Sequence, residues 1–194
     1  LAGSTLGIVG LGAIGKDVAK KAAAFGMKVL AHDVYQDEAF AAANGVSYVS
    51  LEELLAQSDF VTLHCFLAPS THHMINAERL ALMKPTAYLV NTSRGPVVHQ
   101  EALYQALKEK KIAGAALDFF EKEPLEADSP LRTLSNAMLS PHFASNHAGA
   151  IRTRGMMAGE NGLRIRRGAQ PPNEGKPTVL QHEKERRTHR SSHK

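Results

Sequence analysis

The chain has few cysteines, no tryptophan and no long hydrophobic run. Cys65 is the one cysteine among its 194 residues, which excludes an internal disulfide and a metal cluster built on several cysteines. The apolar runs are much shorter than the about 20 residues that span a bilayer, and no signal-peptide pattern opens the chain. These absences predict no membrane partner, no metal site and a reducing, cytoplasmic setting.

Positive charge is scarce outside the C-terminal end of the chain. Residues 164–194 hold nine Lys and Arg against three acids, whereas residues 1–163 carry a net charge of −2. This mildly acidic part argues against a nucleic-acid partner. From Gln170 onward Pro, Glu, Lys, Arg, His and Ser dominate, so we expect residues 169–194 to form a basic, disordered tail. The tail could be an electrostatic arm for an acidic partner or an altered, non-native terminus.

A glycine-rich stretch follows the first apolar run. Residues 5–9 have the composition of a buried parallel strand, and they lead directly into Gly10-Leu11-Gly12-Ala13-Ile14-Gly15. In such a G-x-G-x-x-G pattern the first glycine allows a tight turn, the second lets the backbone approach a pyrophosphate, and the third lets a helix pack closely on a strand. We call residues 10–15 the glycine elbow. We predict that it binds a dinucleotide through its three glycines, Ala13 and Ile14.

The context of the glycine elbow strengthens this prediction, since the pattern alone is a weak signal. A helix is expected over residues 13–25 and a second strand over 28–32. Asp33 follows that strand, 18 residues after Gly15, where a carboxylate can bind a ribose 2′-OH. The next four residues, 34–37, include no cation to bind a 2′-phosphate. The sequence therefore favours NAD over NADP.

Short helices and strands alternate along the rest of the chain. We expect further strands over residues 46–49, 59–64, 87–90, 112–117 and 136–139, with helices over 36–44, from Ser50, over 76–83, 100–110 and about 147–164. This alternation predicts an α/β fold with a doubly wound parallel sheet of the Rossmann type, covered on both faces. Polar residues just past the strand ends would then meet in one crevice: Asp33, His64, Arg94, Asp118 and His142.

Several longer motifs make the chain resemble the D-isomer-specific 2-hydroxyacid dehydrogenases over about residues 1–168. They are Ser58-Asp59-Phe60-Val61-Thr62-Leu63-His64-Cys65, Asn91-Thr92-Ser93-Arg94-Gly95, Gly114-Ala115-Ala116-Leu117-Asp118 with Glu123-Pro124, and Ser140-Pro141-His142. The resemblance implies an NAD-binding domain of an enzyme that transfers a hydride between NADH and a small 2-oxo acid, such as glyoxylate or hydroxypyruvate. It also implies a homodimer.

The resemblance assigns a role to each matching residue. Arg94 would bind the carboxylate and keto oxygen of the substrate. His142 would be the general acid and base, and Glu123 its partner carboxylate, with Glu121 as the competing acid. Asp118 matches the position that contacts the nicotinamide carboxamide. Taken singly, the arginine, glutamate and histidine could equally be structural. Two further cofactor contacts are expected at strand ends, Thr92 and His64, although His64 could also simply pack in the core.

The chain departs from the family pattern in three places. Phe66 stands where the family usually has proline, which we expect to alter only the shape of that loop. The family's N-terminal part of the substrate domain is absent before residue 1, so residues 1–168 would be an NAD-binding domain with the start of the C-terminal substrate-domain segment from about residue 147. The tail also differs. We therefore expect a fragment that binds NAD but turns over weakly or not at all. Two alternatives remain: an NAD-sensing corepressor-like protein, or an inactive truncated product.

Overall fold

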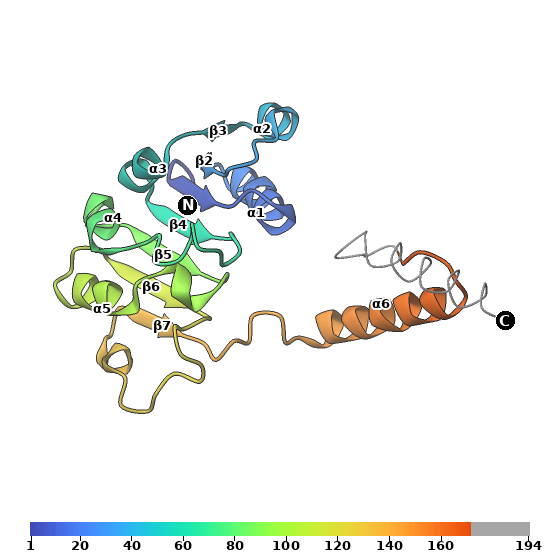
Figure 1. The fold of residues 1–194 in the computed structure, drawn as a ribbon. Coiled ribbons are helices and arrows are strands. Elements are labelled where there is room, and N and C mark those ends of the chain that lie inside the picture. The colour runs from blue at the N-terminus through green and yellow to red at the C-terminus, as the bar shows by residue number, and fades with distance from the viewer. Residues whose placement is uncertain (172–194) are drawn as a thin grey trace. The chain divides into compact units, whose positions relative to one another are not determined.

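A computed structural model of the protein describes residues 1–171 in two units. The first unit comprises Leu1–Ala144, and the second begins at Ser145. The predicted basic tail lies outside the described residues from residue 172 onward, so its predicted disorder is not addressed. The strands all belong to the first unit, where one twisted sheet is flanked by short helices (Figure 1).

The sheet has seven parallel strands in the order β3-β2-β1-β4-β5-β6-β7. The strands are β1 (Thr5–Val9), β2 (Lys28–His32), β3 (Val46–Tyr48), β4 (Phe60–Leu63), β5 (Tyr88–Asn91), β6 (Gly114–Leu117) and β7 (Ala137–Leu139). The predicted doubly wound parallel sheet is confirmed. The chain reverses direction across the sheet between β3 and β4, which makes β1 and β4 central neighbours.

Five α-helices connect these strands: α1 (Ala13–Ala24), α2 (Glu38–Asn44), α3 (Leu51–Gln57), α4 (Ala77–Leu82) and α5 (Gln100–Lys108). The sequence reasoning missed two short 3-10 helices, Gly95–Val97 and Pro130–Thr133. Side chains cap the first turns of four of the helices, as Ser50 and Asn76 do by accepting from the amides of Glu53 and Arg79. The second predicted helix starts two residues late, because Asp37 is its N-cap rather than a helical residue.

Apolar side chains fill a core on each face of the sheet. One core includes the leucines of α3 and α5, and the other includes the alanines of α1 and α2. Successive residues of a strand alternate between them: Ile8 packs with α1, and Val9 packs on the opposite face. The predicted covering of both faces is incomplete, because Tyr88 and Met138 remain 46% and 73% exposed toward the end of the sheet that holds β5 to β7.

The second unit contains one long helix, α6 (Ala148–Arg166), close to the expected range of residues 147–164. His147 caps it by accepting from the amide of Ala150. None of its residues is buried, and Ile151, Met156 and Leu163 are among its exposed apolar side chains. Across residues 1–171, no helix combines the length and the apolar composition that crossing a membrane requires.

Candidate functional site

The glycine elbow turns sharply between β1 and α1 because its glycines leave room for neighbouring backbone. Gly10 has a φ of +95°, and a Cβ there would lie 2.6 Å from the backbone nitrogen of Cys65. A Cβ on Gly15 would overlap the carbonyl oxygen of Gly10. Gly12 is different, since a Cβ on it would meet no atom within 4 Å. Two of the glycines are therefore needed for packing, and the third keeps a space open.

The N-terminus of α1 faces this space without a side-chain cap. Gly12 is the N-cap residue and offers no capping side chain, and the first turn carries no acidic residue. Among the described α-helices, α1 alone lacks such a cap. Its free N–H groups and partial positive charge suit an anion such as a pyrophosphate.

A cavity of about 630 Å³, which we call the elbow cavity, opens beside the elbow. Its lining includes Gly10, Gly12, Asp33 and His64 of the expected cofactor contacts. Asp33 follows β2, and its carboxylate accepts from the amides of Leu11, at 2.6 Å, and Tyr35, at 3.0 Å. These bonds fix the carboxylate against the elbow. The cavity is large enough for part of a dinucleotide, and its donors and carboxylate fit one.

His64 and Cys65 line the same cavity from the end of β4. The imidazole Nε2 of His64 lies 3.0 Å from Oγ1 of Thr62. Burial lowers the pKa of His64, because the charged form is poorly solvated there. Burial likewise raises the pKa of the Cys65 thiol, so both groups are held neutral. A neutral wall at this point suits a nucleoside better than a second phosphate.

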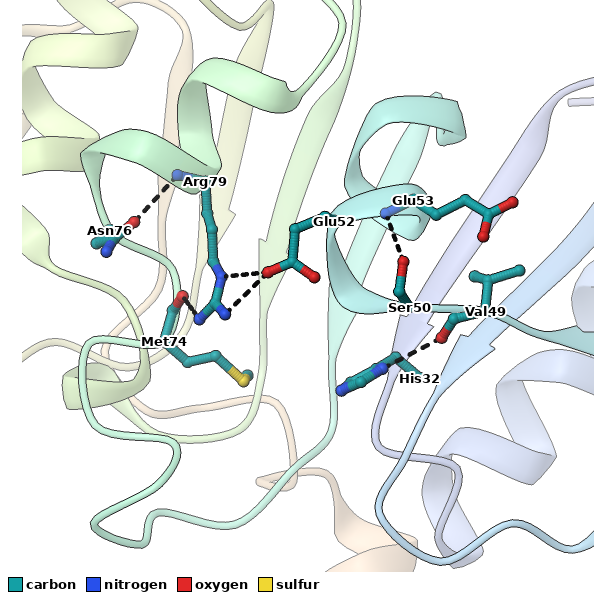
Figure 2. Close-up of polar contacts among 8 residues, drawn as sticks. All are labelled: His32, Val49, Ser50, Glu52, Glu53, Met74, Asn76 and Arg79. Carbon is teal, nitrogen blue, oxygen red and sulfur yellow. Dashed lines mark hydrogen bonds and ion pairs between the residues drawn. The ribbon is translucent and has the colours of Figure 1, made fainter.

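An ion pair between helices lines the elbow cavity, and the sequence reasoning missed it. Glu52 on α3 accepts from Nε and Nη2 of Arg79 on α4, at 3.2 and 3.0 Å (Figure 2). The same guanidinium donates from Nη1 to the carbonyl of Met74 at 2.9 Å. His32, at the end of β2, lies 3.2 Å from the carbonyl oxygen of Val49 (Figure 2). The bonds between Arg79 and Glu52 hold α4 and α3 together at the wall of the cavity.

A second missed contact lies on the other side of the elbow cavity. The ammonium of Lys16, on α1, is 2.5 Å from Oδ2 of Asp37, the N-cap of α2. Both residues line the cavity together with Asp33. Lys16 and Asp37 are 21 residues apart, so neither periodicity nor spacing suggested that they meet.

The turn that carries Arg94 is fixed by the buried side chain of Asn91, at the end of β5. Its Oδ1 accepts from the amide and hydroxyl of Ser93, at 3.0 and 2.9 Å, and its Nδ2 donates to the carbonyl of Arg94 at 3.0 Å. A Cβ on Gly95 would overlap the carbonyl of Phe120. Glycine therefore allows this turn to touch the segment after β6, which brings Arg94 close to it.

Arg94 and His142 both contact one aromatic ring. The guanidinium carbon of Arg94 is 5.3 Å from the ring centroid of Phe119, and the ring centroids of Phe119 and His142 are 4.1 Å apart. Phe119 itself is buried, with 8% of its surface exposed. The cation and the imidazole are thus on one side of the sheet, joined through a residue that the sequence reasoning did not single out.

His142 lies against one of the two acids considered for it. Its Nδ1 is 3.1 Å from Oε2 of Glu123. The competing acid, Glu121, instead lies 3.0 Å from Nε2 of His73 and accepts from the amide of Gln100 at 2.8 Å. Glu123 and His142 also line a second cavity of about 460 Å³. Because Nδ1 faces the carboxylate, Nε2 is the ring nitrogen left for a ligand.

Asp118, directly after β6, holds the segment around His142 in place by hydrogen bonds. Its two carboxylate oxygens accept from the amides of Phe143, at 2.7 Å, and Ala144, at 3.0 Å, and its carbonyl accepts from the amide of His142. Burial opposes its charged form, but these amide hydrogen bonds outweigh burial, and the pKa of Asp118 lies below its ordinary value. The backbone of His142 is left-handed there, with a φ of +55°.

The expected site residues therefore form two groups. Because the strands are parallel, Asp33, His64, Arg94, Asp118 and His142 all follow carboxyl ends on the same edge of the sheet. The elbow cavity is lined by residues 10–12 of the glycine elbow with Asp33 and His64, and the second cavity is lined by Glu123 and His142. Residues 13–15, Arg94 and Asp118 line neither, so these two cavities do not form the single crevice expected for the strand-end residues. Thr92 is exposed after β5, and Ile14 is 67% exposed on α1; neither lines either cavity.

The sequence of this chain is similar to those of known proteins of one family. Residues 1–144 match the family described as D-isomer specific 2-hydroxyacid dehydrogenase, NAD binding domain. The chain is 54% identical over 172 residues to a glyoxylate reductase of Korarchaeum cryptofilum, covering 88% of this chain and 52% of that protein. It is 44% identical over 169 residues to a D-3-phosphoglycerate dehydrogenase of Methanocaldococcus jannaschii, covering 87% and 32%.

The fold is also similar to a solved D-isomer specific 2-hydroxyacid dehydrogenase of Lactobacillus delbrueckii ssp. bulgaricus in its NAD complexed form. The TM-score is 0.79 at 34% identity, and the match covers 87% of this chain and 55% of that chain. The chain thus spans about half the length, or less, of these relatives. The resemblance seen in the sequence motifs is confirmed. This chain belongs to the D-isomer specific 2-hydroxyacid dehydrogenase family, and residues 1–144 form its NAD-binding domain.

Proposed function

We propose that this chain is the cofactor-binding and acid–base half of an NAD-dependent dehydrogenase that interconverts a small 2-oxo acid and its D-2-hydroxy acid. One observation carries the proposal: His142, paired with Glu123, and Arg94 both contact the ring of Phe119. A carboxylate, an imidazole and a guanidinium in this order suit the reduction of a keto group next to a carboxylate. They follow strands of the same sheet edge as the glycine elbow.

The cofactor would be held by groups around the elbow cavity. The free N–H groups at the start of α1 would bind the pyrophosphate, with Gly12, Ala13 and Ile14 contributing backbone. Asp33 would accept from a ribose hydroxyl. Its negative charge would repel the 2′-phosphate of NADP, which favours NAD. Further along the sheet edge, Thr92 and Asp118 would contact the nicotinamide half. When bound, NADH supplies the hydride.

The remaining steps belong to side chains of the chain itself. Arg94 would bind the substrate carboxylate and polarise the keto oxygen with paired charge-assisted hydrogen bonds. Protonated His142 would donate the proton on Nε2 to that oxygen as the hydride arrives, and it would take the proton back in the oxidation. Glu123 would accept from Nδ1–H, which orients the ring and leaves Nε2 facing the substrate. The left-handed backbone at His142, fixed by Asp118, sets the direction of the ring.

The test measures NADH consumption driven by glyoxylate or hydroxypyruvate in the full-length product of the gene. We expect His142→Asn to lower kcat by about a hundredfold or more, which is the usual scale of general acid catalysis. Asparagine tolerates a positive φ, so the backbone is preserved. Glu123→Gln should lower kcat by about tenfold or more. A tenfold loss corresponds to about 1.4 kcal/mol of transition-state stabilisation.

Glu121→Gln is the matched control, because it neutralises the neighbouring acid that faces His73 instead. Its kcat should stay within about twofold of the wild type, in line with a substitution away from the reacting atoms. Equal losses in the two glutamate variants would contradict the assignment of Glu123. NADH binding without any response to a 2-oxo acid, together with peptide binding, would favour the sensor-like alternative.

Several expectations about the whole protein are part of the same proposal. The family resemblance supports a homodimer and a cytoplasmic location for the full-length protein. It also supports residues 1–168 as the cofactor domain with the start of a C-terminal substrate-domain segment. Without the rest of a substrate domain, Arg94 and His142 would work in open water, where electrostatic interactions are weak. The isolated chain should therefore bind NADH and show little or no turnover.

A further inference from the structure

The ion pair between Lys16 and Asp37 lies in the wall of the elbow cavity, which Asp33 also lines. Lys16 is anchored by two contacts, because its ammonium lies 2.5 Å from Oδ2 of Asp37 and 5.2 Å from the ring centroid of Phe40. Its side chain is only 32% exposed. The cation is therefore held at the wall of the cavity rather than free in solvent.

Asp37 is itself fixed by its neighbours. Its Oδ1 caps α2 by accepting from the amide of Phe40 at 3.0 Å, and its own amide donates to the hydroxyl of Tyr48 at 2.9 Å. Because Oδ1 serves the helix, Oδ2 is the oxygen that meets Lys16. The hydrogen bond from Lys16, with the amide bond from Phe40, keeps the pKa of Asp37 below its ordinary value. At neutral pH the carboxylate is ionised and offsets the charge of Lys16.

The two acids at this wall consequently do different things. Asp33 faces the elbow through Leu11 and is placed to bind a ribose hydroxyl. Asp37 faces a cation. A ribose 2′-phosphate carries a charge near −2 at pH 7, as other phosphate monoesters do, and it needs an unshared cation in this region. We propose that Asp37 is a second determinant of the preference for NAD: it occupies Lys16, which would otherwise bind the 2′-phosphate of NADP.

This inference rests on the proposed function, because it requires that the adenosine ribose binds in the elbow cavity. It differs from the role of Asp33 in its mechanism. Asp33 would repel a 2′-phosphate and bind the hydroxyl that NAD has in its place. Asp37 would discriminate without touching NAD, by occupying Lys16, the cation that α1 contributes to the lining of the cavity.

The experiment measures NADH and NADPH dissociation constants by titration calorimetry on the 194-residue chain. Asp37→Asn removes the charge and keeps an amide oxygen that can cap α2, since asparagine is a good N-cap. We expect it to tighten NADPH binding by about three- to tenfold, the net scale of one new hydrogen bond that solvent partly screens. NADH binding should stay within about twofold of the wild type, because NAD has no phosphate for Lys16 to reach.

Two further variants make the result specific. In an Asp37→Asn, Lys16→Met double variant the gain for NADPH should disappear, because methionine keeps much of the alkyl stem over Phe40 but has no charge. Asp33→Asn should weaken NADH binding, unlike Asp37→Asn. A gain that persists in the double variant, or no gain in a stable Asp37→Asn protein that binds NADH normally, would overturn the inference. A wild-type chain that binds neither NADH nor NADPH would refute the proposed cofactor site as well.

Discussion

Replacing two glycines of the elbow one at a time should separate a folding role from a ligand-binding role. A Cβ on Gly15 would overlap the carbonyl oxygen of Gly10 and lie 3.3 Å from Cγ2 of Ile8. A Cβ on Gly12 would meet no atom within 4 Å, yet Gly12 lines the elbow cavity. Alanine at the first position should therefore harm the fold, and alanine at the second should harm only binding.

The size of each effect follows from these contacts. Overpacking costs about 1–3 kcal/mol, and Gly15→Ala regains up to about 1 kcal/mol from helix propensity. Because the atom in the way is backbone, which cannot rotate aside, we expect a net loss of about 1–2 kcal/mol. That loss corresponds to a fall in Tm of roughly 3–8 °C for a chain of this size. For Gly12→Ala, a weaker N-cap and a less flexible unfolded chain nearly cancel, leaving stability within about 0.5 kcal/mol.

Thermal unfolding and NADH titration on the same samples provide the assay. Gly12→Ala should unfold at the wild-type temperature and bind NADH at least about tenfold more weakly, a loss of about 1.4 kcal/mol. Gly15→Ala should unfold earlier. Normal NADH binding by Gly12→Ala would show that the pyrophosphate does not approach this residue. Wild-type stability of Gly15→Ala would refute the packing argument.

Two other predictions concern the residues around His142. The pKa of Asp118 is depressed, so its carboxylate stabilises the fold above the ordinary value of 3.8 and this contribution is lost as the pH falls through the lower folded value. Asp118→Asn should thus lower the free energy of unfolding at pH 7 by about 1–3 kcal/mol, which lowers Tm. It should also make Tm less dependent on pH between pH 5 and pH 3. An acid profile of Tm that matches the wild type would contradict this. Phe119→Leu keeps a buried apolar residue but removes the ring that Arg94 and His142 both contact. The kcat of the full-length product should therefore fall by about three- to thirtyfold, the scale of a cation–π contact of about 0.7–2 kcal/mol; a wild-type kcat would show that the ring does not position either group.

The elements of the fold could be predicted from the sequence because local signals mark them. Ser50 and Asn76 predict helices that begin at the next residue, and each caps its helix by accepting from the amide three residues further on. The strand-end polar residues could be placed on one sheet edge because parallel strands all end there. The exact first residue of a helix is harder to predict, as Asp37 shows. Its sequence context does not distinguish an N-cap aspartate from an aspartate in the first turn of the helix.

Contacts between distant segments could not be predicted in the same way. Lys16 meets Asp37 across 21 residues, and Arg79 meets Glu52 across 27. Surface ion pairs of this kind depend on how α1 lies beside α2 and α3 beside α4, which no local pattern encodes. Phe119 was missed for another reason. An apolar residue after a strand predicts only core packing, and its contact with Arg94 depends on the close approach at Gly95.

The position of β1 in the centre of the sheet has a consequence for how the protein is made. Among the strands of this sheet β1 comes first in the sequence, but one of its two neighbours, β4, is synthesised about 55 residues later. Gly10 packs against the backbone of Cys65, just past β4. Such long-range parallel pairing forms slowly. NAD could therefore not act as a template while β1 and α1 are being synthesised, because the turn that would bind it is completed only after β4 and Cys65 have been made.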